Sequence, residues 1–138
     1  MAANTAPIFT LAPDVQWSPL LVSASNATTD GTAGTTYLIF SASAEGGFVQ
    51  RVRFRALGTN VATVGRIWIN NGLTSGSAAN NALIDEITLN ATSAAPAASL
   101  ANQEVPINFA IPAGYRLFVT LGTAVAAGFD VTAIGGRY

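Results

Sequence analysis

Hydrophobic and polar residues alternate along several short stretches of this chain, which is the pattern of a β-strand with one buried face. In the stretch from Val105 to Ile111 every second residue is apolar, and the stretch from Tyr115 to Leu121 repeats this alternation. Clusters of Gly, Pro, Asn and Ser separate such stretches, and none of them shows the length or period of a helix. The pattern predicts eight strands, at residues 17–23, 35–41, 48–57, 61–70, 82–90, 104–111, 115–121 and 129–134.

Prolines and turn residues indicate how these strands are connected. Because Pro106 has no N–H to donate to a ladder, we expect its strand to lie at a sheet edge or to contain a bulge. Residues 57–61 predict a hairpin turn, and residues 111–115 predict a tight connection between two strands. The alanine- and serine-rich residues 91–101 contain a proline and are expected to form a loop.

Eight short strands without a helix favour an all-β fold. We expect an antiparallel β-sandwich of the jelly-roll type, with an immunoglobulin-like sandwich as the alternative. A length of 138 residues suits a single domain. Prolines punctuate residues 1–16, which are predicted to form an extended N-terminal arm, while residues 17–138 are predicted to form the sandwich.

The predicted arm contains three large apolar residues, Ile8, Phe9 and Leu11. They are expected either to pack on the chain's own sandwich or to be buried on a neighbouring subunit. Trp17, at the end of the arm, is interpreted as a core residue or as an anchor for the arm. The N-terminus has neither a basic segment nor an apolar run, so no signal peptide is expected.

The low proportion of charged residues favours a subunit of an assembly over an ordinary monomeric domain. Only 9% of the residues are charged, against roughly 25% in an average soluble domain. A surface of Ala, Thr, Ser, Asn and Gly loses little hydration when a partner covers it. The net charge of −1 provides no basic field for nucleic acid or an anionic membrane, and no apolar stretch is long enough to span a bilayer. We therefore expect neither nucleic acid nor membrane as a partner.

The residue types that carry most enzyme chemistry are missing. The chain has no His, no Cys and no Lys, which excludes Ser-His and Cys-His pairs, thiolate zinc sites and Schiff bases. A pair of carboxylates would remain, but Asp85 and Glu86 are the only adjacent pair, and neighbours in a strand point to opposite faces. No aspartate-rich loop of the calcium-binding kind is present. We expect a protein that is not an enzyme and holds no cofactor.

One predicted strand carries three arginines, Arg51, Arg53 and Arg55, on one of its two faces. If the next strand pairs with it through a hairpin, Arg66 and Trp68 join the same outer face. The opposite register would place the arginines beside isoleucines, and desolvating those charges is unfavourable. The residues expected to face the core from the first strand are Phe48, Gln50, Val52, Phe54 and Ala56.

This arginine face has two main interpretations. It is either a solvated face, where arginine stems cover apolar surface and stack on Trp68, or a docking face for an acidic partner. The predicted interface residues are therefore these arginines with Trp68, together with the apolar residues of the arm. Nucleic-acid binding is a weaker third interpretation, because few aromatic residues lie among the arginines.

Four segments of the sequence resemble a known family. These are residues 50–63 (QRVRFRALGTNVAT), 66–72 (RIWINNG), 107–115 (INFAIPAGY) and 119–128 (VTLGTAVAAG), and the resemblance spans roughly residues 35–138. They are similar to the jelly-roll decoration, or cement, proteins of tailed bacteriophage capsids. No site residue transfers with the resemblance, because its motifs are structural.

The resemblance implies a virion protein on the outer surface of a capsid, synthesised in the cytoplasm of the host bacterium. It implies that the chain bridges subunits of the major capsid protein and forms a homo-oligomer, a dimer or a trimer. The alternative is a tail-associated or surface glycan-binding jelly-roll module, in which Trp17, Trp68 and tyrosines stack on sugars.

Overall fold

The alternating stretches form antiparallel strands. The computed structural model describes residues 10–22, 29, 31 and 35–138, and this part of the chain contains eight strands and one 3-10 helix. Their bounds are β1 Ala12–Leu21, β2 Tyr37–Ser41, β3 Gly47–Ala56, β4 Thr63–Asn70, η1 Ala78–Asn80, β5 Asn81–Leu89, β6 Asn102–Ile111, β7 Arg116–Leu121 and β8 Phe129–Arg137.

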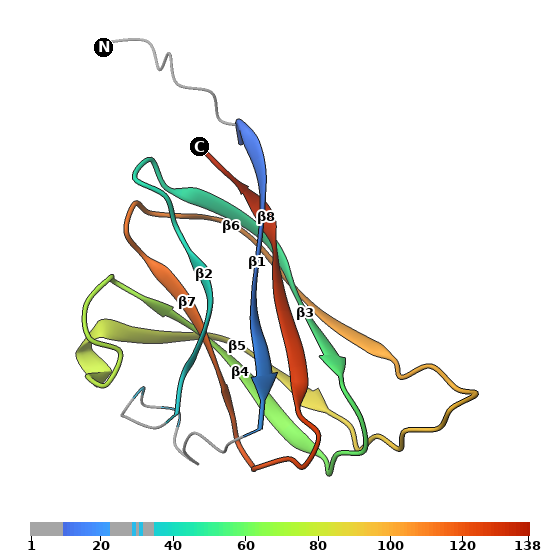
Figure 1. Cartoon of the computed structure of the whole chain (residues 1–138). Coiled ribbons are helices and arrows are strands. Elements are labelled where there is room, and N and C mark those ends of the chain that lie inside the picture. The colour runs from blue at the N-terminus through green and yellow to red at the C-terminus, as the bar shows by residue number, and fades with distance from the viewer. Residues whose placement is uncertain (1–9, 23–28, 30, 32–34) are drawn as a thin grey trace, which may run out of the picture.

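The strands form two four-stranded sheets that pack face to face (Figure 1). Sheet A has the order β1-β8-β3-β6, and sheet B has the order β2-β7-β4-β5. Every connection except the one between β4 and β5 crosses from one sheet to the other. This strand order is that of a jelly roll, so the predicted fold class is confirmed.

The crossing connections correct one prediction. Residues 57–61 do not form a hairpin, because β3 belongs to sheet A and β4 to sheet B. Asn60 anchors this connection: its Oδ1 accepts hydrogen bonds from the backbone N–H groups of Ala127 and Gly128, at 2.9 and 2.8 Å. The expected tight connection at residues 111–115 is present and joins β6 to β7, with the N–H of Tyr115 donating to the carbonyl of Pro112.

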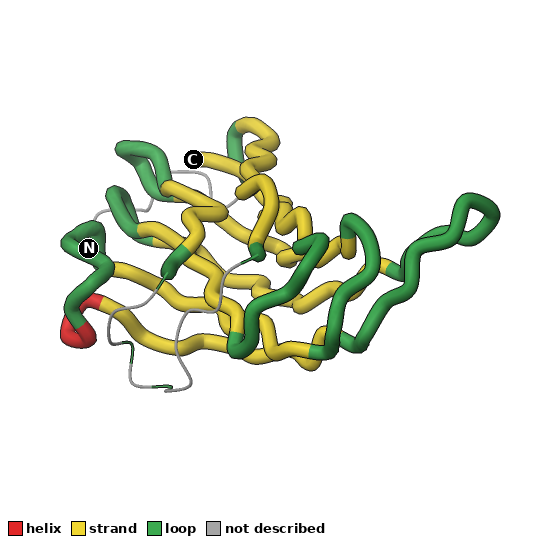
Figure 2. The backbone as a smooth tube through the Cα atoms, turned by 60° about the horizontal axis from the view of Figure 1, so that its bottom comes forward, coloured by secondary structure: helices red, strands yellow, loops and turns green. Residues whose placement is uncertain are grey.

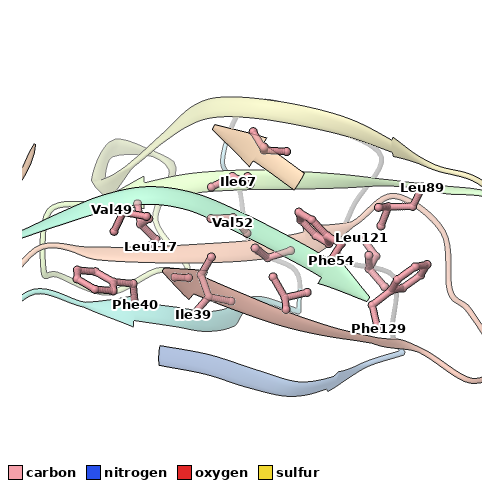
Figure 3. Close-up of a cluster of buried hydrophobic side chains, with 14 of the residues drawn as sticks. Ile39, Phe40, Val49, Val52, Phe54, Ile67, Leu89, Leu117, Leu121 and Phe129 are labelled. Atoms are coloured by element: carbon pink, nitrogen blue, oxygen red, sulfur yellow. The ribbon is translucent and has the colours of Figure 1, made fainter. Parts of the chain in front are cut away.

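The core lies between the two sheets and is built from alternate residues of the strands (Figure 3). On β7 the inner residues are those predicted, and on β6 Val105 and Ile111 are buried. On β3 the core-facing set differs from the prediction. Val49 is fully buried, whereas Gln50 is exposed and Phe48 is half-buried. A register shift between Val49 and Arg51 reverses the alternation at this point.

The two edges of sheet A differ in their contacts. At one edge, the side-chain amide of Gln16 in β1 exchanges two hydrogen bonds with the backbone of Ser41 in β2, at 2.8 and 3.0 Å. At the other edge, β6 contains Pro106, as expected for an edge strand, and Asn108 has a φ of 53°. A ladder therefore cannot extend regularly past β6, whereas β1 is tied to β2 through the Gln16 side chain.

The first strand begins earlier than predicted. Ala12 to Gln16, expected in the arm, pair with β8, so these residues belong to the sandwich domain. Of the apolar arm residues, Ile8 and Phe9 lie outside the described residues. Leu11 is 73% exposed, and its N–H donates to the carbonyl of Arg137 at the end of β8.

Candidate functional site

The outer face of sheet A exposes large apolar side chains along β1. Three odd-numbered residues, Leu11, Val15 and Trp17, point outward and are exposed, while the even-numbered residues between them are at least partly covered. The indole of Trp17 is 64% exposed. An edge strand with this pattern leaves an apolar strip in water, and such strips commonly mark surfaces that another molecule covers.

The same face carries the three arginines of β3. The register shift before Arg51 turns the following residues so that Val52 and Phe54 enter the core and Arg51, Arg53 and Arg55 point outward. The prediction that these three arginines share an outer face is therefore confirmed. The tryptophan on that face is Trp17, from the segment assigned to the arm, and not Trp68.

Strand pairing places these side chains in rows across sheet A. Trp17 pairs with Thr132, which pairs with Arg53, which in turn pairs with Glu104. A second row runs from Val15 through Ile134 and Arg51 to Pro106, and a third joins Asp130, Arg55 and Asn102. Apolar residues thus lie along β1, and charged groups lie on the other three strands.

Glu104 organises two of the three arginines. Its carboxylate lies 2.6 Å from Nε of Arg53 and 3.4 Å from Nε of Arg51. Arg55 instead donates from Nη1 to the side-chain oxygen of Asn102 at 3.2 Å, and it makes no ion pair with a carboxylate of the described residues. These groups are more than a third exposed, so the pairs fix orientation and add little stability.

Arg66 and Trp68 do not belong to this face, which corrects the expectation that four arginines lie together. Both residues are in β4, and β4 belongs to sheet B. Arg66 is mostly buried, pairs with Glu86 at 3.5 Å, and borders a shallow hollow. The expectation assumed that strands adjacent in sequence also pair, whereas the jelly roll places β3 and β4 in opposite sheets.

The tryptophan on the outer face of sheet B is buried, unlike Trp17 on sheet A. Trp68 is only 4% exposed, and its Nε1 donates to the hydroxyl of Thr120 at 2.9 Å. Gly31, in the connection between β1 and β2, lies against the indole ring, and its carbonyl accepts a hydrogen bond from Asn81. Trp68 is therefore a buried structural residue in contact with Gly31, and its indole is not available for a partner.

The loop between β5 and β6 projects beyond the end of the sandwich (Figures 1 and 2). Residues 93–99 of this loop are all exposed, and they are small or proline. Its base is fixed, because Thr92 and Asn60 exchange backbone hydrogen bonds and the Thr92 hydroxyl donates to the carbonyl of Gly58 at 2.7 Å. The loop predicted at residues 91–101 is confirmed. The sequence did not predict that it projects beyond the sandwich.

Several carboxylates of the described residues are engaged by neighbouring groups. Glu104 and Glu86 pair with arginines, Asp85 accepts the backbone N–H of Glu86, and Asp14 accepts a bond from Gln16. In the same part of the chain no group of three or more potential ligands lies together. No helix found there is long and apolar enough to cross a membrane.

The sequence did not lead us to expect Trp17 on the same face as the arginines. The signal was present, because Leu11, Pro13, Val15 and Trp17 alternate with Ala12, Asp14 and Gln16. This is the period of a strand, but the prolines directed the interpretation towards an arm.

A search of protein-family models, of curated proteins and of solved structures found no match to this chain.

Proposed function

We propose that this chain is a structural, non-enzymatic protein that decorates and stabilises a bacteriophage capsid. In this role it binds the outer surface of the virion and bridges subunits of the major capsid protein. The observation that carries the proposal is the outer face of sheet A, where exposed apolar residues of β1 lie beside the arginines of β3. The resemblance of residues 35–138 to decoration proteins supplies the setting.

Two further features support an assembled subunit. The surface carries few ions, so burying it against neighbours removes little hydration. The projecting loop of residues 91–101 offers small side chains on a fixed base, which lets a neighbouring backbone approach closely. The chain also lacks His, Cys and Lys, which leaves few routes to catalysis.

The test is an add-back experiment with capsids that lack the protein. Added wild-type chain is expected to bind them and to raise their resistance to heat and to chelators. Trp17→Ala is expected to bind much more weakly, because it alters a face that a neighbouring molecule of the assembly, capsid protein or second copy, covers. The matched control is Leu73→Ala, which removes an exposed apolar side chain outside sheet A and is expected to bind like the wild type. Capsids whose stability does not change, together with no binding, would refute the proposal.

The exposure of Trp17 also favours a second candidate, a glycan-binding module of a tail or surface protein. A flat indole beside Thr132 and Arg53 offers both a stacking surface for a sugar ring and donors for its hydroxyl groups. A glycan array tests this candidate. Binding that Trp17→Ala abolishes, with labelling of tails and not of heads, would favour it over capsid decoration.

A further inference from the structure

The charges on the outer face of sheet A are arranged by strand. The cations Arg51, Arg53 and Arg55 are on β3, and the carboxylates Glu104 and Asp130 are on the two strands that flank it. Glu104 is engaged by two arginines, but Asp130 is part-buried, forms no ion pair with the residues that the structure describes, and has a buried Oδ1 without a hydrogen-bond partner among them. Arg55 is directed to Asn102 on the far side. One cation and one carboxylate on this face therefore lack an ionic partner within the described part of the chain.

The order of the strands makes this pattern complementary to itself. The middle of sheet A lies between β8 and β3. A two-fold axis above this line and parallel to the strands lays β8 of one copy over β3 of the other. Such an axis preserves position along the strands, so the row that contains Asp130 and Arg55 meets the same row of the second copy. Asp130 of each copy then faces Arg55 of the other.

The positions of the charges favour this dimer over the other two-fold symmetric dimer in which the same faces meet. An axis perpendicular to the strands would lay β3 over β3, and arginines would face arginines, which is unfavourable. With the axis parallel to the strands, β1 lies over β6 of the second copy. Val15, which shares a row with Pro106, then meets Pro106 of that copy, and Trp17 meets its Arg53–Glu104 pair. Indole and guanidinium groups stack favourably.

The size of the face is sufficient for a dimer. Its strands have nine or ten residues. With a rise of about 3.3 Å per residue and a strand spacing of about 4.8 Å, the four strands cover roughly 600 Å². Two such faces bury about 1,200 Å², the lower limit for specific complexes. Association through the β6 edge is disfavoured, because Pro106 has no N–H to donate to a ladder there.

We propose that the outer face of sheet A binds a second copy of this chain, with β8 of each copy over β3 of the other. The inference rests on the proposed function in taking this face as one that is covered in the assembly. It adds the occupant, the symmetry and the pair of residues that specifies them, Asp130 and Arg55.

The test is a mixing experiment with two charge reversals. Arg55→Asp alone places two carboxylates together across the axis, and Asp130→Arg alone places two cations together, so each is expected to weaken dimerisation more than about ten-fold. An equal mixture of the two variants pairs Asp130 with Arg55 and the new Asp with the new Arg. It is therefore expected to form mixed dimers, measured by sedimentation equilibrium and native mass spectrometry.

The controls separate this interface from other effects. Glu45→Arg reverses a charge in an exposed turn outside the face and is expected to dimerise like the wild type. Circular dichroism melting shows whether each variant is folded, and Arg55→Gln and Asp130→Asn provide milder variants if a reversal does not fold. A contact within one chain would change the melting temperature of the variants, but mixing them would not restore dimers.

Two results would overturn the proposal: a wild-type chain that remains monomeric at every concentration, or a mixture no more dimeric than its components. The proposed function fails separately. Monomers that still bind capsids would reject the dimer alone, and dimers that do not bind capsids would reject the capsid role alone.

Discussion

The outer faces of the two sheets differ in what covers them. Each face carries a tryptophan and at least one arginine, yet Trp17 on sheet A is 64% exposed and Trp68 on sheet B is 4% exposed. On sheet B, Gly31 from the β1–β2 connection lies on the indole, and Thr120 accepts its N–H. No described residue covers Trp17 in a comparable way.

This contrast shows that residue type does not decide whether the side chains on the outer face of a strand are exposed to solvent or buried by another part of the chain. On sheet B the chain itself covers Trp68, so this indole contributes to folding. On sheet A, Leu11, Val15 and Trp17 stay exposed. Substitution of Trp68 should therefore change stability, and substitution of Trp17 should change assembly.

The largest effect is expected for Trp68→Ala. It removes a buried side chain and the donor for the Thr120 hydroxyl, and should lower the free energy of unfolding by about 3–5 kcal/mol. Guanidinium denaturation measures this change. Trp68→Phe, which keeps most of the volume but not the N–H, should lose less. A loss under about 1 kcal/mol for Trp68→Ala would mean that sheet B is not completed by its own chain.

The next effect concerns the register shift that turns the arginines outward. Gly135 lies opposite this shift, and a Cβ there would be 1.9 Å from the carbonyl oxygen of Phe48. Gly135→Ala should destabilise the protein by about 1–3 kcal/mol, because β3 and β8 must separate to admit the methyl group. Gly76→Ala, where a Cβ would meet only the methyl group of Thr74 at 3.9 Å, is the control and should be nearly neutral in the same denaturation assay. Equal midpoints for the two variants would contradict this account.

A smaller effect is expected at the edge where the sheets meet. Gln16→Ala removes both hydrogen bonds to the backbone of Ser41 and should destabilise the protein by about 1 kcal/mol. Amide hydrogen exchange should show faster exchange at Ser41 than in the wild type. Unchanged exchange at Ser41 would show that this side chain does not close the edge.

The smallest effect on stability is expected for Trp17→Ala. Because the indole is mostly exposed, the free energy of unfolding should change by no more than about 0.5 kcal/mol, measured by denaturation at low protein concentration. The same substitution should weaken dimerisation and binding to capsids. Stability that falls as far as in Trp68→Ala would show that both faces are parts of the core.

Local pattern was sufficient to predict most of the fold. The predicted strand at residues 48–57 is β3, Gly47–Ala56, and the predicted strand at 104–111 lies within β6, Asn102–Ile111. Alternation also placed Arg51, Arg53 and Arg55 on the outside. These properties depend on residues close in the chain, and the two-residue period of a strand records them directly.

Pairing between strands was predicted less well. The hairpin expected at residues 57–61 led to a shared face for β3 and β4, but a jelly roll sends these strands to different sheets. The core set of β3 was displaced because one register shift exchanges Val49 with Gln50. A single extra residue in one strand changes how that strand pairs with its neighbours. The alternation of apolar and polar residues upstream of it does not predict this change.

The sequence by itself determined where most of the strands lie, which arginines share β3, and how few charged residues the chain carries. Only the tertiary structure decided that Trp17 is exposed beside those arginines and that Trp68 is buried. The reason is physical. Alternation gives each strand two faces, but the partner sheet and the segment that covers the outer face depend on contacts between residues far apart in the chain, such as Trp68 with Thr120 and Gly31.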